Sequence, residues 1–507
     1  MTRKQTPSYV LTLKLDTNNR DESILDKRFE ICRKLYNSIL GLGLKRFKTL
    51  SELKVYRTLR KELAELNKSY YKDENSKKSK LNEKLRKEKY KELTALLGEY
   101  GINEYSLINE MTPMYKPFNK NIDNKTAQAL ASRAWKALEK LIYSNAERVN
   151  FVRFDELYSV EGKWNASGIT YRDGVIKWNK LNMPVIIKNN DIYAQKAIQD
   201  RIKYCRIIRK MIRGKYKFYV QLVMEGLPPI KVNQDGEIKR NIGLGNVGID
   251  IGTRTIAFSS KYDVKLLELC PEVENIQKEK NKLQRKLDRQ RRSNNPNNYN
   301  EDGTIKRGIK LERIKSNKYI KTQNELREIQ RKQADIRKQS HEKLANYIIS
   351  LGDRILVETM QFQGLQKRAK KTTKNKQGKF NKKKRFGKSL ANKAPAKLIE
   401  IINRKLNYNG LKILKINTQK VKASQYNHFT NEYNKKELKD RWNEDINIQR
   451  DCYSAFLIMN INNDLETINQ DKCFETYNDF KILHDKEIER LKELKLQGYK
   501  LISSMGI

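Results

Sequence analysis

The segment Val247–Ile251 is an apolar run interrupted by a single acid, Asp250, and Gly252 and a second apolar stretch follow it. This composition predicts a strand buried on both faces, then a tight turn and another strand. An unpaired carboxylate in such a strand costs roughly several kcal/mol unless it is neutralised or held by a cation. The segment alone leaves two partners open, a bound metal ion and a neighbouring cation such as Arg254.

Two more acids stand at the ends of predicted elements. Glu358 ends the apolar run Ile355–Val357, which is typical of a buried parallel strand, and open α/β sheets place ligands at that edge. A solvated acid at a strand end is the alternative. Asp451 opens the predicted helix 451–461, where capping of the helix N-terminus is the alternative role. A helix over 389–410 and the strand LKILKIN lie between these two acids.

Charge restricts the class of partner. The chain has 107 Lys and Arg against 60 Asp and Glu, a formal net charge of +47. A compact protein with this excess repels itself unless it meets a polyanion, and nucleic acid is the usual one. An anionic membrane is the competing partner, but no long apolar run or basic amphipathic anchor stands out. The composition therefore predicts nucleic-acid binding and no membrane partner.

The most basic segment, 366–388, is almost entirely cationic and polar. It cannot bury enough apolar surface to fold alone, so we expect a loop that becomes ordered on phosphate. A nuclear-import signal is the alternative. The nucleic-acid contacts predicted from the sequence are Lys367, Arg368, Lys370, Lys371, Lys382, Lys383, Lys384, Arg385 and Arg450.

The five cysteines are scattered and never form a Cys-x-x-Cys pair. This pattern argues for a reducing cytoplasm and against both a disulfide framework and a cysteine-built zinc site. The first residues, MTRKQTPSYV, lack the apolar core of a signal peptide. We therefore expect a cytoplasmic protein without zinc.

The rest of the chain predicts alternating α and β regions. Leu11, Leu13 and Leu15 alternate with polar residues as in a strand. Helical patterns cover about 23–91 and 125–149, and short strands follow from 151, including the alternating segment 216–224. Two charged helices over about 272–292 and 318–350 predict a hairpin lying across the surface of the domain that carries the acids. The first strand is expected to join the later strands in one barrel.

Three motifs carry a resemblance to a known family. GIDIGTRTIAF, ILVETM and IQRDCYSAFLI resemble the first, second and third RuvC motifs of the TnpB nucleases, which are encoded by transposons, and of their descendants, the compact type V CRISPR effectors. The resemblance covers about 180–460 and is only architectural before that. The order of the acids is also the order that an RNase H-like fold requires: one on a strand, one ending a strand and one opening a helix.

This resemblance implies a multidomain α+β and α/β fold, in which a split wedge-like β-barrel with a helical recognition insert precedes a RuvC (RNase H-like) nuclease domain with its own helical insert. The implied boundaries are 1–20 for the first barrel strand, 21–150 for the recognition domain, 151–245 for the rest of the barrel, 246–420 for RuvC motifs I and II with the hairpin, 421–449 for a target-nucleic-acid-binding loop, 450–464 for motif III and 465–507 for a helical tail.

The resemblance also implies the activity. An RNA-guided DNA endonuclease would bind a structured guide RNA, read a short flanking motif in double-stranded DNA and cleave the DNA in one RuvC site. Asp250 would bridge two magnesium ions, with manganese as a substitute, while Glu358 and Asp451 would each help to hold one ion. The alternatives are an RNA-guided repressor with a silent nuclease site and a guide-independent RuvC-type resolvase or transposase.

One departure from the family concerns zinc. The family usually has a ribbon of two Cys-x-x-Cys pairs between the second and third motifs. Here the interval 422–451 has no cysteine before the third motif and a single histidine, His428. One histidine with some acids does not make a structural zinc site. We therefore predict that the loop 421–449 folds without zinc.

Overall fold

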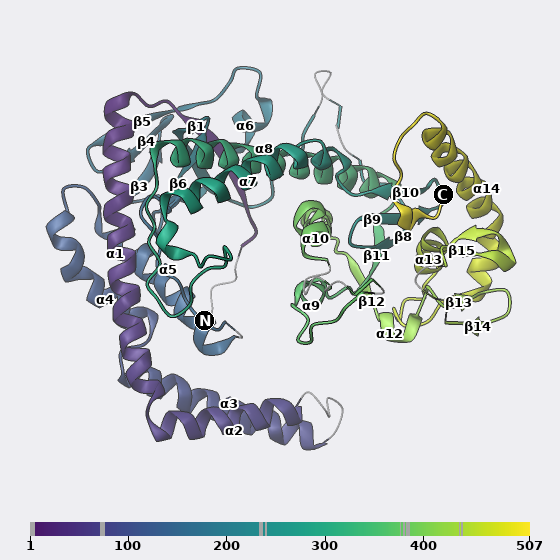
Figure 1. The fold of residues 1–507 in the computed structure, drawn as a ribbon, viewed down its shortest axis with the longest axis horizontal. Helices are drawn as coiled ribbons and strands as arrows, with labels where there is room; N and C mark the ends of the chain where they lie inside the picture. Colours follow the sequence, from purple (N-terminus) through teal and green to yellow (C-terminus); the bar gives the residue numbers. More distant parts are fainter. Residues whose placement is uncertain are drawn as a thin grey trace. The chain divides into compact units, whose positions relative to one another are not determined.

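The computed structural model describes residues 6–70, 77–144, 146–232, 237–238, 241–375, 377–378, 381, 386–435, 437 and 440–507. The chain divides into two compact units, Met1–Pro229 and Ile230–Ile507 (Figure 1), so the division falls earlier than residue 246, where the motifs suggested it. Among the described helices, none has both the length and the apolar character needed to cross a membrane. All five cysteines are buried thiols.

The N-terminal unit is built on one antiparallel sheet of seven strands in the order β2-β6-β7-β1-β5-β4-β3. β1 lies between β7 and β5 although the other strands follow it by more than a hundred residues, and its leucines are buried in alternation, as expected. β3 also contacts β6, near the opposite end of the strand order, so the sheet curls into an open barrel. The strands are β1 (Ser8–Leu15), β2 (Ser159–Glu161), β3 (Ile169–Arg172), β4 (Val175–Trp178), β5 (Leu181–Ile186), β6 (Ile202–Ile212) and β7 (Lys215–Glu225).

Helices fill the sequence between β1 and β2. The first begins with a capping box, in which the side chains of Asn18 and Asp21 each accept from the other residue's backbone N–H. It packs on α5, while α2 and α3 lie side by side (Figure 1). The short helix α4 was not predicted, and Pro113 lies inside it. The helices of this segment are α1 (Asn19–Ser51), α2 (Lys54–Tyr70), α3 (Lys77–Glu99), α4 (Glu104–Tyr115) and α5 (Asn124–Tyr143), and the short α6 (Ile192–Ala197) lies between β5 and β6.

The C-terminal unit contains a mixed sheet of five strands in the order β10-β9-β8-β11-β12. β8, β9 and β10 are antiparallel neighbours, whereas β11 is parallel to both β8 and β12. Ile355, Leu356 and Val357 are buried, which confirms the predicted parallel strand with two covered faces. The strands are β8 (Asn246–Ile251), β9 (Thr255–Ser260), β10 (Val264–Glu268), β11 (Arg354–Glu358) and β12 (Leu414–Ile416).

Helices cover the two faces of this sheet with alternate strand residues beneath them. Ile249 and Val357 join a core with the end of α8 (Asn317–Leu351) and α11 (Pro395–Asn407). Leu356 and Ala257 join a second core with α13 (Arg450–Met459) and α14 (Gln470–Leu496). The segment 465–507, predicted as a helical tail, is therefore part of the core of this unit.

Two predictions for the C-terminal unit need correction. The hairpin of α7 (Gln277–Asn294) and α8 does not pack along its length on the surface of the domain that carries the acids, because only the C-terminal end of α8 joins the core and α7 buries only Gln277. The helix expected over 389–410 is two helices, α10 (Gly387–Lys393) and α11. Ala394 between them has a positive φ of 45°, and Pro395 cannot continue a helix from the preceding turn.

Candidate active site

Adjacent parallel strands bring the first two acids together. The register pairs Ile249 of β8 with Val357 of β11, so Asp250 and Glu358 occupy the next neighbouring positions. Parallel strands lie about 4.8 Å apart, and residues in register point to the same face. Ile249 and Val357 face α8 and α11, so the two acids face the opposite side of the sheet, where α13 lies.

The third acid, Asp451, lies on α13, and this helix contacts β8 at Gly248. A Cβ on Gly248 would lie 2.1 Å from the backbone oxygen of Ala455 and 2.3 Å from the nitrogen of Met459. Gly248 and Asp250 are two residues apart and share one face of the strand. Asp451 lies one helical turn before Ala455, on the same face of α13. Because that face of the helix contacts Gly248, Asp451 lies on the same side of the sheet as Asp250. The need for glycine at 248 is a site feature that the sequence reasoning missed.

Asp451 does not cap its helix. The cap is Gln449, whose side-chain oxygen accepts the N–H of Cys452 at 2.8 Å. The side-chain amide of Gln449 donates to the carbonyl of Met505 at 3.2 Å, and its backbone N–H donates to Nε2 of His484 at 3.0 Å. The capping alternative for Asp451 is therefore wrong. Gln449 was missed because glutamine is not among the preferred N-cap residues and because two of its partners, His484 and Met505, lie far away in the sequence.

The cations beside the acids are Arg441 and Arg450. Nη1 of Arg441 lies 3.9 Å from Oδ1 of Asp451. Nη1 of Arg450 donates to the carbonyls of Glu437 and Asp440 at 2.9 and 3.3 Å, which ties the loop before α13 to the helix. Arg254, considered above as a partner for Asp250, is exposed, and the positive charges that favour the Asp250 carboxylate come from Arg450 and Arg441.

The three carboxyl groups carry more negative charge than these cations balance. Burial, then the charges of Asp451 and Glu358, raise the pKa of Asp250 well above its ordinary value. Burial raises the pKa of Glu358. Burial also raises the pKa of Asp451, against the opposing effect of Arg441, Arg450 and a hydrogen bond from Gln449. Such a cluster attracts a further cation.

Hard oxygen ligands of this kind suit magnesium, so the donor set fits the predicted ion. Among the residues that the structure describes, however, no three Asp, Glu, His or Cys side chains converge closely enough to form a metal site. The metal-ligand roles of Asp250, Glu358 and Asp451 therefore stay predictions. In the structure, these three acids come from three separate elements and lie on one face of the sheet.

The loop 421–449 is held by aromatic packing. His428 is fully buried, and its Nδ1 lies 2.6 Å from the hydroxyl of Tyr453. Its ring has five aromatic neighbours with centroids 4.0 to 5.8 Å away: Phe429, Tyr453, Phe456, Phe474 and Tyr477. Tyr453 lies two residues after Asp451, so this cluster connects the loop to the helix that carries the third acid.

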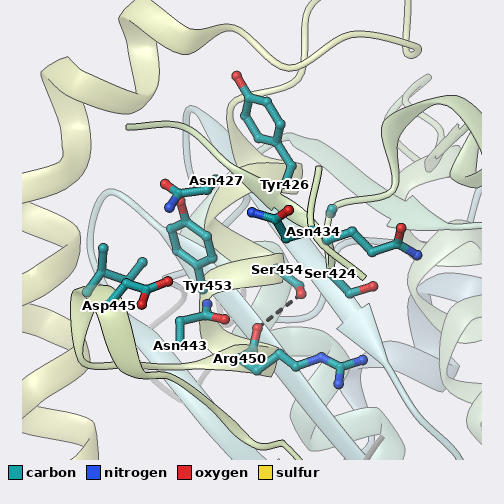
Figure 2. A pocket seen from close by; sticks show the side chains of 12 residues that line it. Ser424, Tyr426, Asn427, Asn434, Asn443, Asp445, Arg450, Tyr453 and Ser454 are labelled. Carbon is teal, nitrogen blue, oxygen red and sulfur yellow. Dashed lines mark hydrogen bonds between the residues drawn. The ribbon is translucent and has the colours of Figure 1, made fainter. Parts of the chain in front are cut away.

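The same loop forms short strand pairs beside α13. These are β13 (Tyr426–Asn427) with β14 (Glu432–Tyr433) and β15 (Trp442–Asn443) with β16 (Ile448–Gln449). The indole N–H of Trp442 donates to the carbonyl of Gly506 at 2.8 Å. Between the loop and the helix lies a polar pocket of about 40 Å³ (Figure 2), whose lining includes Arg450, Tyr453 and Ser454. This volume suits a few water molecules rather than a nucleotide.

The predicted nucleic-acid contacts are placed unevenly. Lys367, Arg368, Lys370 and Lys371 are exposed, so they are free to reach a polyanion. Lys382, Lys383, Lys384 and Arg385 lie outside the described residues. Arg450 instead donates within the chain, as given above. Contact with nucleic acid stays a prediction for all nine residues.

The sequence matches no protein-family model and no curated protein. Among solved structures, the chain is similar to a cryo-EM structure of a Cas12f1–sgRNA–target DNA complex, with 12% identity and a TM-score of 0.40, covering 90% of this chain and 99% of that one. It is also similar to a CRISPR–Cas12f ternary complex, with 13% identity and a TM-score of 0.21, covering 81% of this chain and 77% of that one. These structural similarities are too weak to assign a function. The function is therefore inferred from the residues of the site.

Proposed function

We propose that this chain is an RNA-guided DNA endonuclease related to the TnpB nucleases and the compact type V effectors. The observation that carries the proposal is the placement of Asp250, Glu358 and Asp451 on one face of the sheet, from β8, β11 and α13. The strand order β10-β9-β8-β11-β12, followed by α13, supports an RNase H-like nuclease domain. The open N-terminal barrel would be the wedge-like domain, and α1–α5 its recognition insert.

The acids would hold two magnesium ions, which when bound activate a water molecule and stabilise the leaving oxygen of a phosphodiester. Asp250, Glu358 and Asp451 would hold these ions together, and Asp250 is the acid on which the charges of the other two act. The raised pKa of Asp250 supports a cation-binding role, since like charges held together in a buried place are stabilised by added positive charge.

Guide RNA and double-stranded DNA are the proposed partners, and the cytoplasm is the proposed location. A net charge of +47 supplies sequence-independent phosphate binding, while base pairing between guide and target would supply specificity. The affinity for nucleic acid should then fall steeply with salt, with a slope of about −0.9 per duplex phosphate neutralised.

The test combines copurifying RNA with cleavage. Sequencing the RNA that copurifies with the full chain should give one structured species with a variable guide, and a random collection of fragments would remove the RNA-guided part of the proposal. That complex, with magnesium and a plasmid matching the guide, should cut the plasmid, and Asp250→Ala should not. Target binding without cutting by the parent chain would favour the silent repressor, and cutting without any guide would favour a resolvase-type nuclease.

A further inference from the structure

An exposed tryptophan lies among lysines on the N-terminal unit. Trp164, in the loop between β2 and β3, is 41% exposed. The ammonium groups of Lys125 and Lys163 lie 4.8 and 5.8 Å from the centroid of its ring. The indole N–H donates to the hydroxyl of Ser167 at 2.8 Å, which fixes the direction of the ring. The two ammonium groups therefore lie over a partly exposed aromatic ring. The remaining exposed surface of the ring, next to these cations, suits an anionic ligand with a planar ring.

The loop that carries Trp164 is held in place from several sides. The backbone N–H of Asn165 donates to the carbonyl of Lys203 at 3.0 Å, and its side-chain oxygen accepts the N–H of Tyr171 at 2.7 Å. Gly168 ends the loop at φ +84°, and a Cβ there would lie 2.5 Å from the carboxylate of Asp123, the residue that caps α5. The ring is therefore positioned before any ligand arrives, which lowers the entropic cost of binding.

Trp164 stands at the edge of an open groove of about 530 Å³. Three segments line the groove: 164–166, 171–173, and Ile198 with 200–203. They contribute Arg172, Arg201 and Lys203 against Asp173 and Asp200, so with Lys125 and Lys163 nearby the charge balance is positive. A cavity of this size is within the range that holds a ligand as large as a nucleotide.

We propose that this groove binds an unpaired nucleobase of the RNA, stacked on Trp164, with the flanking phosphates held by Lys125 and Lys163. Stacking accepts any base, because every base has a π face, and it requires an unpaired one. The lysines beside the ring favour a polyanion, which a neutral aromatic ligand would not use. The identity of the ligand as RNA rests on the proposed function, but the site can hold a base whether or not the chain cleaves DNA.

The test uses the full chain, titrated with a single-stranded oligoadenylate of about twelve nucleotides and with an RNA duplex of the same length. Tryptophan emission should be quenched by the single strand more than by the duplex, and Trp164→Phe should remove this quenching. Trp164→Ala should weaken single-strand binding about tenfold or more. Trp164→Phe should stay within about threefold of the parent, because phenylalanine also stacks. Tyr105→Ala, at an aromatic residue on α4 that is 74% exposed, is the matched control and should change nothing.

Equal single-strand affinity of Trp164→Ala and the parent would overturn the site, and so would equal quenching by poly-glutamate. The two proposals fail separately. If guided cleavage occurs and Trp164→Ala leaves RNA affinity unchanged, only this inference is lost. If Trp164 stacks on the oligoadenylate and no guided cleavage occurs, only the endonuclease proposal is lost.

Discussion

Two clusters of buried charge, one in each unit, differ in how far their charges are balanced. In the N-terminal unit, the side chain of Arg209 of β6 is 4% exposed and fully provided with partners. Its guanidinium lies 3.1 Å from a carboxylate oxygen of Asp26 and 3.1 Å from one of Asp155, and Nε donates to the carbonyl of Leu157 at 2.9 Å. It also stacks over the ring of Tyr216 at 4.3 Å. One buried cation is thus balanced by two acids and a carbonyl.

In the C-terminal unit the balance is reversed and incomplete. Asp250, Glu358 and Asp451 are gathered on one face, and Arg441 reaches only Asp451, at 3.9 Å. Burial and mutual repulsion raise the pKa of Asp250, whereas in the first cluster charges and hydrogen bonds satisfy each other. A balanced buried cluster is explained by structure alone, and an unbalanced one needs a ligand. The two clusters should therefore respond in opposite ways to loss of their central charge.

The largest effect is expected at Asp250. Asp250→Asn should lower guided cleavage by about 10⁴-fold, the scale seen when a member of a catalytic set is removed. The same change should leave the unfolding temperature at pH 7.5 equal or higher, because it removes a carboxylate repelled by its neighbours. Cleavage rates and thermal unfolding of the full chain measure both. Glu272→Gln, at an exposed acid in the same unit, is the control and should alter neither. A clear loss of stability in Asp250→Asn would mean that the acidic centre is structural, like the Arg209 cluster.

The second effect concerns the support of the acidic centre. Gln449→Ala should lower kcat about 10- to 100-fold, as is usual for residues that orient metal ligands. The same substitution removes the hydrogen bond that caps α13, which should lower the free energy of unfolding by about 1 kcal/mol. Gln449→Asn retains a capping side chain but is too short to reach Met505, so it should recover more stability than activity. Equal recovery of both would show that the bond to Met505 does nothing for the site.

The sequence predicted Asp250 and Glu358 from local signals, since an acid in or after a buried apolar run is visible within a few residues. It also predicted the parallel β11 and that β1 joins the later strands in one sheet, but not that its neighbours would be β7 and β5. Gln449 and Gly248 were out of reach because their roles come from contacts with Met505 and with the backbone of α13, which no local pattern encodes. Asp451 was ambiguous for the same reason, because an acid in a first helical turn fits a cap until the true cap is seen.

The elements that differ from prediction have physical causes of the same kind. The helix over 389–410 breaks at Ala394 because Pro395 begins a new helix, although the apolar period continues across it. The hairpin of α7 and α8 was expected to lie across the surface of the domain that carries the acids, but its apolar residues are so sparse that only the C-terminal end of α8 joins the core. In both elements, packing between segments that are distant in the sequence determines where the helices end and what they contact.

A smaller effect, on stability alone, is expected at Arg209. Arg209→Met should lower the free energy of unfolding by about 2–3 kcal/mol, the contribution of hydrogen bonds to a charged group. Arg209→Lys should recover little, since an ammonium cannot reach both carboxylates and the Leu157 carbonyl in one plane. Urea unfolding of the full chain measures the loss, with the exposed Lys215→Ala as control. Cleavage per folded molecule should be unchanged, and a large loss of cleavage would mean that the balanced cluster also acts in function.

The smallest effect is expected at His428, which is buried as a neutral group, unlike the two charged clusters. It concerns how the stability of the chain depends on pH. Burial lowers the pKa of His428 to about 4, against an ordinary value of 6.5. The unfolded chain therefore takes up the proton first as the pH falls, so the stability that neutral His428 provides is present above about pH 6.5 and lost toward pH 4. His428→Phe keeps the aromatic packing but cannot titrate. The stability of the parent relative to His428→Phe should fall by about 1–2 kcal/mol between pH 7.5 and pH 5. Thermal unfolding of both chains at the two pH values measures this difference, and a zinc chelator should leave it unchanged. If the stability difference between the two chains were the same at both pH values, His428 would be in contact with solvent. If the chelator lowered the stability of the parent, the loop would hold zinc.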